Sequence, residues 1–112
     1  MSDAVCNIVD HTGWSKKEIT SICNAVKREF SAWFDGCKLD VIWYDDKSLS
    51  GLYEKYSDYF YANYGTIVGI RFTTGTDYNG NYGLKPNTEY EMYCLLFNYF
   101  QVRWEAIGYV FE

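Results

Sequence analysis

The sequence predicts one small α+β domain, with two to three mainly antiparallel strands and about three helices packed against the sheet. Apolar residues recur every three or four positions over residues 16–34, as on one face of a helix. Two shorter runs, 38–44 and 66–74, have the alternation or the β-branched content of strands. A chain of 112 residues fits a single domain, residues 1–112, with its helices on one face of the sheet.

The N-terminal third contains the clearest element. Residues 4–9 form a short apolar run that fits either a strand or a short helix. Ser15 and Glu18 then make a capping box, because the serine oxygen can accept the amide that lies three residues on. The helix that follows ends at Asp35-Gly36. Its apolar stripe consists of Ile19, Ile22, Cys23, Val26, Phe30 and Trp33.

The middle of the chain alternates strands with an aromatic segment. Residues 38–44 predict a strand, and the polar residues 45–48 predict a turn after it. A short helix is expected within 52–64, where tyrosines occupy more of the circumference than a core stripe requires. Residues 66–74 predict a second strand, paired with the first in an antiparallel or mixed sheet.

The last third begins with a glycine- and asparagine-rich loop over residues 75–87. Asn87 is a suitable cap for a third helix, and apolar residues from Met92 onward keep helical spacing, so we expect a helix through at least Tyr99. The residues around Trp104 also alternate as a strand would, and the end of this helix therefore stays open.

The charge of the chain restricts the partners that it can bind. The formal net charge is −5, whereas nucleic-acid binding requires a basic patch for phosphate contacts. A negative chain is also repelled by anionic membranes, and no apolar run reaches the about 20 residues of a membrane span. We expect a protein partner with a basic surface, with no direct contact to nucleic acid or membrane.

The cysteines do not form a metal motif. Cys6, Cys23, Cys37 and Cys94 include no C-x-x-C pair, and His11 is the only histidine. The first residues are not those of a secretory signal. The prediction is a cytoplasmic protein with reduced, mostly buried thiols.

Three patterns could support catalysis or metal binding, and each has an ordinary structural explanation or lacks a required residue. His11 could activate a cysteine nucleophile, but its sequence context is that of a surface turn. The pair Asp45-Asp46 could hold a divalent cation, but adjacent carboxylates on an extended chain point apart. The loop from Asp77 to Thr88 misses the glycine and the bidentate glutamate of a calcium loop. We therefore expect no catalytic residue, cofactor or metal, and a binding protein rather than an enzyme.

Tyrosines mixed with carboxylates are the strongest functional signal. The chain contains 12 Tyr, and such rings supply contact area at low entropic cost, while carboxylates attract Arg and Lys. One predicted partner-binding group comprises Tyr53, Glu54, Tyr56, Asp58, Tyr59 and Tyr61. The other comprises Asp77, Tyr78, Tyr82, Glu89, Tyr90 and Glu91.

In size, charge and tyrosine content the chain resembles the small acidic antagonists carried by phages and mobile elements, anti-CRISPR proteins among them. It is also similar to bacterial toxin-immunity proteins. The resemblance implies stoichiometric inhibition of a protein with a basic or nucleic-acid-binding surface, and it assigns no residue. The alternatives are a toxin-immunity protein, a small enzyme or ligand-binding protein using His11, a cysteine or Asp45/Asp46, and an oligomer joined through its tyrosines. Both a monomer and a homodimer remain open.

Overall fold

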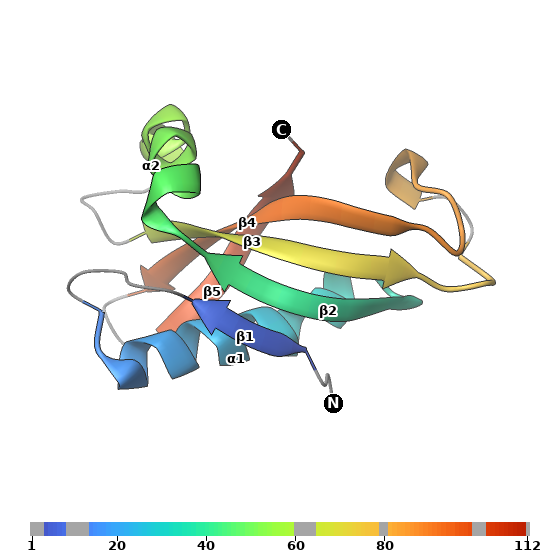
Figure 1. Ribbon diagram of the computed structural model, residues 1–112, viewed down its shortest axis with the longest axis horizontal. Coiled ribbons are helices and arrows are strands. Elements are labelled where there is room, and N and C mark those ends of the chain that lie inside the picture. The colour runs from blue at the N-terminus through green and yellow to red at the C-terminus, as the bar shows by residue number, and fades with distance from the viewer. Residues whose placement is uncertain (1–3, 9–13, 60–64, 79–80, 100–102, 112) are drawn as a thin grey trace.

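One mixed sheet of five strands runs through the molecule (Figure 1). The computed structural model describes residues 4–8, 14–59, 65–78, 81–99 and 103–111. β1 pairs parallel with β2, and every later pair is antiparallel. The strands lie side by side in chain order: β1 (Val5–Ile8), β2 (Cys37–Tyr44), β3 (Gly65–Thr74), β4 (Glu89–Tyr99) and β5 (Arg103–Val110).

The described chain forms two α-helices, which lie on opposite sides of the sheet. α1 (Lys16–Trp33) connects β1 to β2 and runs below the sheet in Figure 1. α2 (Asp46–Lys55) connects β2 to β3 and rises above one end of the sheet. Single 3₁₀ turns follow at Ser57–Tyr59 and Asn81–Gly83. No helix within these ranges is long and apolar enough to cross a bilayer.

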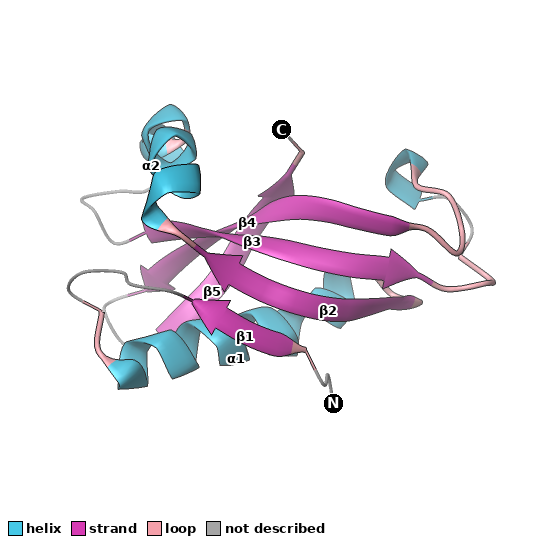
Figure 2. Ribbon diagram, viewed as in Figure 1, coloured by secondary structure: helices cyan, strands magenta, loops and turns pink. Residues whose placement is uncertain are grey.

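The predicted architecture of two to three strands and about three helices on one face is wrong. The described chain has five strands and two α-helices, and the sheet dominates the molecule (Figure 2). The helix predicted from Asn87 is β4, and the segment left open around Trp104 is β5. In the middle of β4, Cys94, Leu95 and Leu96 are consecutive and all buried, so both faces of this part of the strand are covered. Its continuous apolar run, 92–97, has no alternation and imitates helical spacing.

Other local predictions have mixed outcomes. The helix over 16–34 is confirmed as α1, and the Ser15 Oγ accepts the Glu18 amide at 3.1 Å. The strands 38–44 and 66–74 are confirmed as β2 and β3, and they pair antiparallel.

The predicted turn at 45–48 is wrong, because α2 already begins at Asp46. The Asp45 carboxylate caps this helix by accepting the amides of Lys47 at 3.0 Å and Ser48 at 3.3 Å. Of the helix predicted within 52–64, residues 52–55 belong to α2, which starts earlier and ends at Lys55, and residues 60–64 lie outside the described residues. Of the open alternatives for residues 4–9, the strand is observed, as β1.

The main core lies between α1 and the sheet. α1 presents its apolar stripe to the residues of each strand that point to the same side, and rings gather where the helix ends. The Phe72 ring, fully buried on β3, lies 5.5 Å from the Phe30 ring and 5.0 Å from the Phe34 ring. The helix also covers the outer strand, since the Arg28 guanidinium donates to the Trp104 carbonyl at 3.0 Å and the Glu29 carboxylate accepts the Ala106 amide at 3.1 Å.

The opposite face of the sheet carries an indole packed flat on a glycine. Trp43 on β2 and Gly69 on β3 are cross-strand partners, and the Trp43 ring occupies the space that a side chain at position 69 would fill. The ring centroid of Tyr93, the partner of Gly69 on β4, lies 6.0 Å from that of Trp43. Glycine at position 69 is therefore required by packing.

Gly69→Ala tests this arrangement. The added methyl group would displace the indole from its site, and we expect the free energy of unfolding to fall by about 1–3 kcal/mol. Urea denaturation followed by tryptophan fluorescence measures the change. Gly51→Ala is the matched control, because nothing described lies within 4 Å of its added methyl group apart from its chain neighbours and the nearby backbone of α2. Equal stability of the two variants would contradict the packing.

A disulfide joins the first strand to α1. Cys6 and Cys23 are bonded across 17 residues of chain, while Cys37 and Cys94 are free thiols. The prediction that the thiols are reduced is therefore wrong for two of the four cysteines. The spacing of the cysteines could not indicate the bond, because Cys6 comes within reach of Cys23 only when β1 joins the sheet under which α1 packs.

Candidate protein-binding surface

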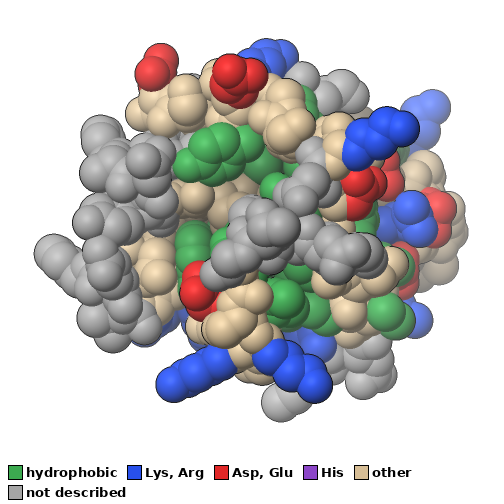
Figure 3. All heavy atoms as spheres, turned by 60° about the vertical axis from the view of Figure 1, so that its left-hand side comes forward, with side chains coloured by type: hydrophobic (Ala, Val, Ile, Leu, Met, Phe, Trp, Pro, Cys, Tyr) green, Lys and Arg blue, Asp and Glu red, His purple; other side chains and the backbone are tan. Residues whose placement is uncertain are grey.

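The first predicted group lies on and after α2. Tyr53 and Tyr56 are half-buried and pack against the core, whereas Glu54 and Asp58 are exposed. Figure 3 shows this side of the molecule, with acidic side chains at the top and hydrophobic ones below them. The side chain of Tyr59 and the whole of Tyr61 lie outside the described residues. In the described part of this group, the Tyr53 and Tyr56 rings therefore pack against the core, and only the acidic side chains are exposed to solvent.

The second group lies at the far end of the sheet, on the loop between β3 and β4 and on the first residues of β4. Thr74, only 2% exposed, anchors this loop. Its hydroxyl donates to the Lys85 carbonyl and accepts the Thr88 amide at 2.9 Å. The Lys85 amide in turn donates to the Tyr90 hydroxyl at 2.9 Å. The loop is therefore held by specific hydrogen bonds near both ends of its described part.

Within the second group, three tyrosines come together. Tyr78 is 8% exposed, Tyr90 is half-buried and Tyr82 is 62% exposed. Burial raises the pKa of the Tyr78 hydroxyl, and the neighbouring Cys37, Tyr82 and Tyr90 raise it further. These three tyrosines are therefore neighbours, but only Tyr82 presents most of its ring to solvent.

A chain of ring contacts connects Tyr82 to the core. The Tyr82 ring lies 5.3 Å from the Phe34 ring, and Phe34 lies 5.0 Å from Phe72. From Phe72 the contacts continue to Tyr90 at 5.9 Å and then to Phe111 at 6.3 Å. We call Phe34, Phe72, Tyr82, Tyr90 and Phe111 the aromatic cluster. Its two ends, Tyr82 and the 48% exposed Phe111, are two of the three large hydrophobic residues that are exposed in the described chain.

The backbone of Tyr82 adopts an unusual conformation. Its φ is +62°, in the left-handed region that favours glycine. A residue with a side chain loses roughly 1–2 kcal/mol in this region, and a bulky one is a clear outlier. The conformation places a large ring at the surface and against Phe34 at a cost to folding.

The acids of the second group do not all lie beside the aromatic cluster. Glu89 and Glu91 alternate with Tyr90 on β4, so they point away from the face that carries the aromatic cluster. Glu91 is also 3.3 Å from the guanidinium of Arg71. Asp77 remains on the loop, and Asp35, which was not predicted, is exposed directly after Phe34. Neither Asp35 nor Asp77 forms an ion pair with a described residue.

The residues considered for catalysis or metal binding give no assembled site within the described ranges. His11 lies outside those ranges. Asp45 caps α2, and the Ser48 hydroxyl and the two capping amides lower the pKa of its carboxyl group. The side chain of Asp46 is not among those described. No group of three His, Cys, Asp or Glu side chains able to hold a metal occurs in the described part.

Cys94 is chemically protected rather than reactive. Complete burial raises the pKa of its thiol from 9.0 to about 12. The hydroxyl of Tyr109, its cross-strand partner, also has a raised pKa because of burial and of the neighbouring thiol. The Trp33 and Phe34 rings lie 5.2 Å and 5.0 Å from the Tyr109 ring and close this region.

The raised pKa of Cys94 predicts a loss of stability at high pH. The unfolded thiol releases its proton above pH 9.0, whereas the folded thiol keeps it to about pH 12, so unfolding is favoured progressively between these values. We expect a slope of about 1.4 kcal/mol per pH unit from one such group. Urea denaturation at pH 8 to 10 measures it. Cys94→Ala should flatten the slope, and an unchanged slope would contradict the assignment.

Comparison with known proteins finds no match: no family model, no curated protein and no solved structure is similar to this chain. Any assignment of function must therefore come from the residues themselves.

Three residues of the surface were not predicted from the sequence. Phe34 was read as the end of a helix, Asp35 as part of a stop signal, and Phe111 was not considered. The structure places Phe34 beside Tyr82 and Phe111 beside Tyr90. For Asp35 the usable signal was its position immediately before a glycine turn, where exposed residues often lie, whereas Phe34 is buried beneath Tyr82.

Proposed function

We propose that this protein acts by stoichiometric binding of a partner protein with a basic surface, as an inhibitor or antagonist. The binding surface is the loop end of the sheet, where Tyr82 and Phe111 provide aromatic contacts and Asp35 and Asp77 provide charge. Of the two predicted groups, we therefore propose the one around Tyr82 as the interface, and not the one on α2.

The single observation that carries the proposal is Tyr82. An exposed tyrosine on left-handed backbone destabilises the folded protein, and such strain is concentrated at functional sites. Its ring is already held against Phe34, so little side-chain entropy is lost when a partner covers it. Anchored aromatic residues of this kind are the usual hot spots of interfaces.

The charges favour a basic partner. Asp35 and Asp77 are exposed, and their carboxylates are not neutralised by any described cation. Arg is suited to this surface, because its guanidinium stacks on aromatic rings and pairs with carboxylates. A partner that normally binds nucleic acid offers such side chains, which agrees with the compositional resemblance to anti-CRISPR antagonists. An association of this type is weakened by salt.

Two charge-reversal variants distinguish the two surfaces. Asp35→Lys/Asp77→Lys and Glu54→Lys/Asp58→Lys change the net charge equally, so a general charge effect would act on both. We expect the first variant to lose about tenfold or more in capture of the partner from a lysate of the native host, and the second to retain it.

Quantitative mass spectrometry of the eluates, at low and high salt, reads out the capture, and circular dichroism checks that both variants fold. Equal capture by wild type and Asp35→Lys/Asp77→Lys would exclude the loop end. Loss of capture in Glu54→Lys/Asp58→Lys alone would instead indicate that the interface lies on α2.

A further inference from the structure

The first strand is an exposed edge with little support from the rest of the fold. β1 has four residues, of which Val5, Cys6 and Asn7 are exposed. Its pairing is limited to Val41–Tyr44 on β2, and β1–β2 is the only parallel pair within the described sheet. Short edge strands of this kind open easily, because few buried contacts hold them.

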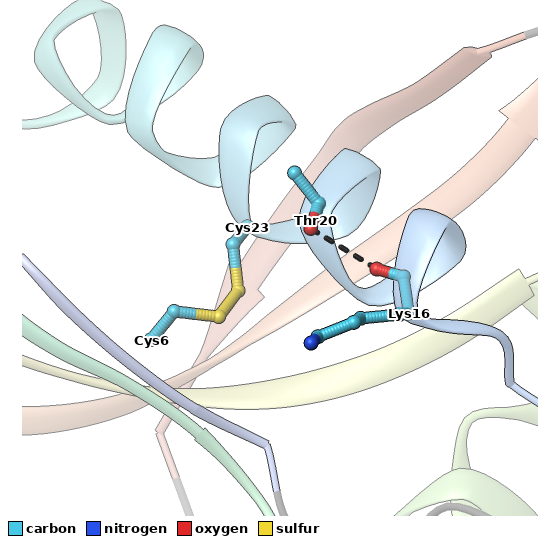
Figure 4. Close-up of a disulfide and its surroundings, with 4 residues drawn as sticks. All are labelled: Cys6, Lys16, Thr20 and Cys23. Carbon is cyan, nitrogen blue, oxygen red and sulfur yellow. Dashed lines mark hydrogen bonds between the residues drawn. A yellow bond between two sulfur atoms is a disulfide. The ribbon is translucent and has the colours of Figure 1, made fainter.

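The disulfide is the covalent connection between this strand and the helix below it. Cys6 is the cross-strand partner of Ile42 and points toward α1, where Cys23 is 3% exposed (Figure 4). Thr20 and Lys16 lie on the same side of α1, three and seven residues before Cys23. Since Cys6 is exposed and Cys23 is buried, an external thiol reaches the bond from the Cys6 side.

We propose that the Cys6–Cys23 disulfide is a redox latch that prevents the exchange of β1 between two copies of this chain. With the bond intact, β1 is tied to α1 of its own chain. After reduction, β1 can leave the edge of β2 and be replaced by β1 of a second copy.

The edge itself identifies the second copy as the occupant. The parallel register that pairs Val5 with Val41 and Ile8 with Tyr44 exists in the folded chain. β1 of another copy has the same sequence, so it can pair with β2 in the same register and make the same contacts. Exchange of identical elements is for this reason a low-cost route to dimers. The Val41–Tyr44 segment carries no charge and consists of residues that favour strands, so it needs a cover when β1 leaves.

A dithiol is the reductant that we assign to the opening reaction. Its thiolate attacks the Cys6 sulfur, the S–S bond breaks, and the Cys23 sulfur leaves as a thiolate that takes up a proton. The second thiol of the reductant then displaces the Cys6 sulfur and closes the reductant's own disulfide. Two electrons pass from the dithiol to the protein, which gains two thiols.

Isotope mixing tests the exchange directly. The background is Cys37→Ser/Cys94→Ala, which keeps only the two latch cysteines. Equal amounts of ¹⁵N-labelled and unlabelled protein are reduced with dithiothreitol, concentrated, and reoxidised by removing the reductant. Mass spectrometry of peptides digested without reduction then determines whether labelled Cys6 is bonded to unlabelled Cys23. An identical mixture that was never reduced is the control.

We expect mixed-isotope Cys6–Cys23 peptides in the reoxidised sample and none in the control, together with a species of twice the monomer mass in light scattering. Before reoxidation, hydrogen exchange at residues 5–8 should accelerate by about tenfold or more relative to β3. Peptides of one isotope only, with monomer mass, would overturn the proposal. So would four free thiols in the wild-type protein denatured without reductant, because no latch would then exist.

Discussion

We expect Phe72→Ala to lower the free energy of unfolding by about 3–5 kcal/mol, the largest stability effect of any substitution considered. Phe72 is fully buried at the centre of the aromatic cluster and contacts the rings of Phe30, Phe34 and Tyr90. Removal of its ring leaves a cavity beneath both exposed ends of the cluster. Urea denaturation, with the midpoint and the slope fitted separately, gives the change.

Phe72→Leu is the control for this substitution. It keeps most of the apolar volume, so we expect it to cost clearly less than alanine. Both variants should also bind the partner more weakly, since Phe34 and Tyr90 lose the ring that they pack on. A loss below about 1 kcal/mol for Phe72→Ala would show that the cluster is not the centre of the core.

Tyr82→Ala should reduce partner affinity by about 30-fold or more, which corresponds to the 2 kcal/mol that defines an interface hot spot. The ring is exposed before binding and is anchored on Phe34, so its removal takes contact area from the interface without unfolding the loop. Biolayer interferometry with the captured partner measures the affinity. Tyr82→Phe keeps the ring and should retain most of the binding.

Tyr82→Gly separates binding from folding at the same position. Glycine relieves the left-handed backbone strain, while the exposed ring contributes little core packing, so thermal stability should stay equal to wild type or rise. Binding should fall as in Tyr82→Ala. If Tyr82→Gly were strongly destabilised and bound normally, the ring would serve the fold and not an interface.

The parts of the fold that could be predicted are those whose periodicity, or whose β-branched residues in the case of β3, favours one kind of element. α1 has a single apolar stripe and a serine cap, so periodicity and local chemistry agree. β4 was assigned as a helix because it is buried on both faces, and a two-sided apolar run contains no period. Asp45 was assigned to a turn because aspartate suits turns and helix caps equally. β1 is too short for either assignment to be preferred from its pattern.

The candidate site was predictable in composition but not in geometry. Tyrosine is amphipathic, so its presence at position 53 or 82 does not determine whether the ring faces the core or the solvent. In the structure Tyr53 is half-buried because α2 packs on the sheet. Tyr82 is exposed because the loop turns at this residue. The contribution of Phe34 depends on a contact across 48 residues of chain, which no local pattern contains.

Photo-crosslinking in the native host tests the binding surface most directly. A benzophenone amino acid is placed at position 82, and matched controls carry it at the exposed positions Ser50 on α2 and Thr20 on α1. The proposed interface predicts one discrete protein adduct from position 82 and none from the controls. An adduct from position 50 or 20, with none from position 82, would contradict it.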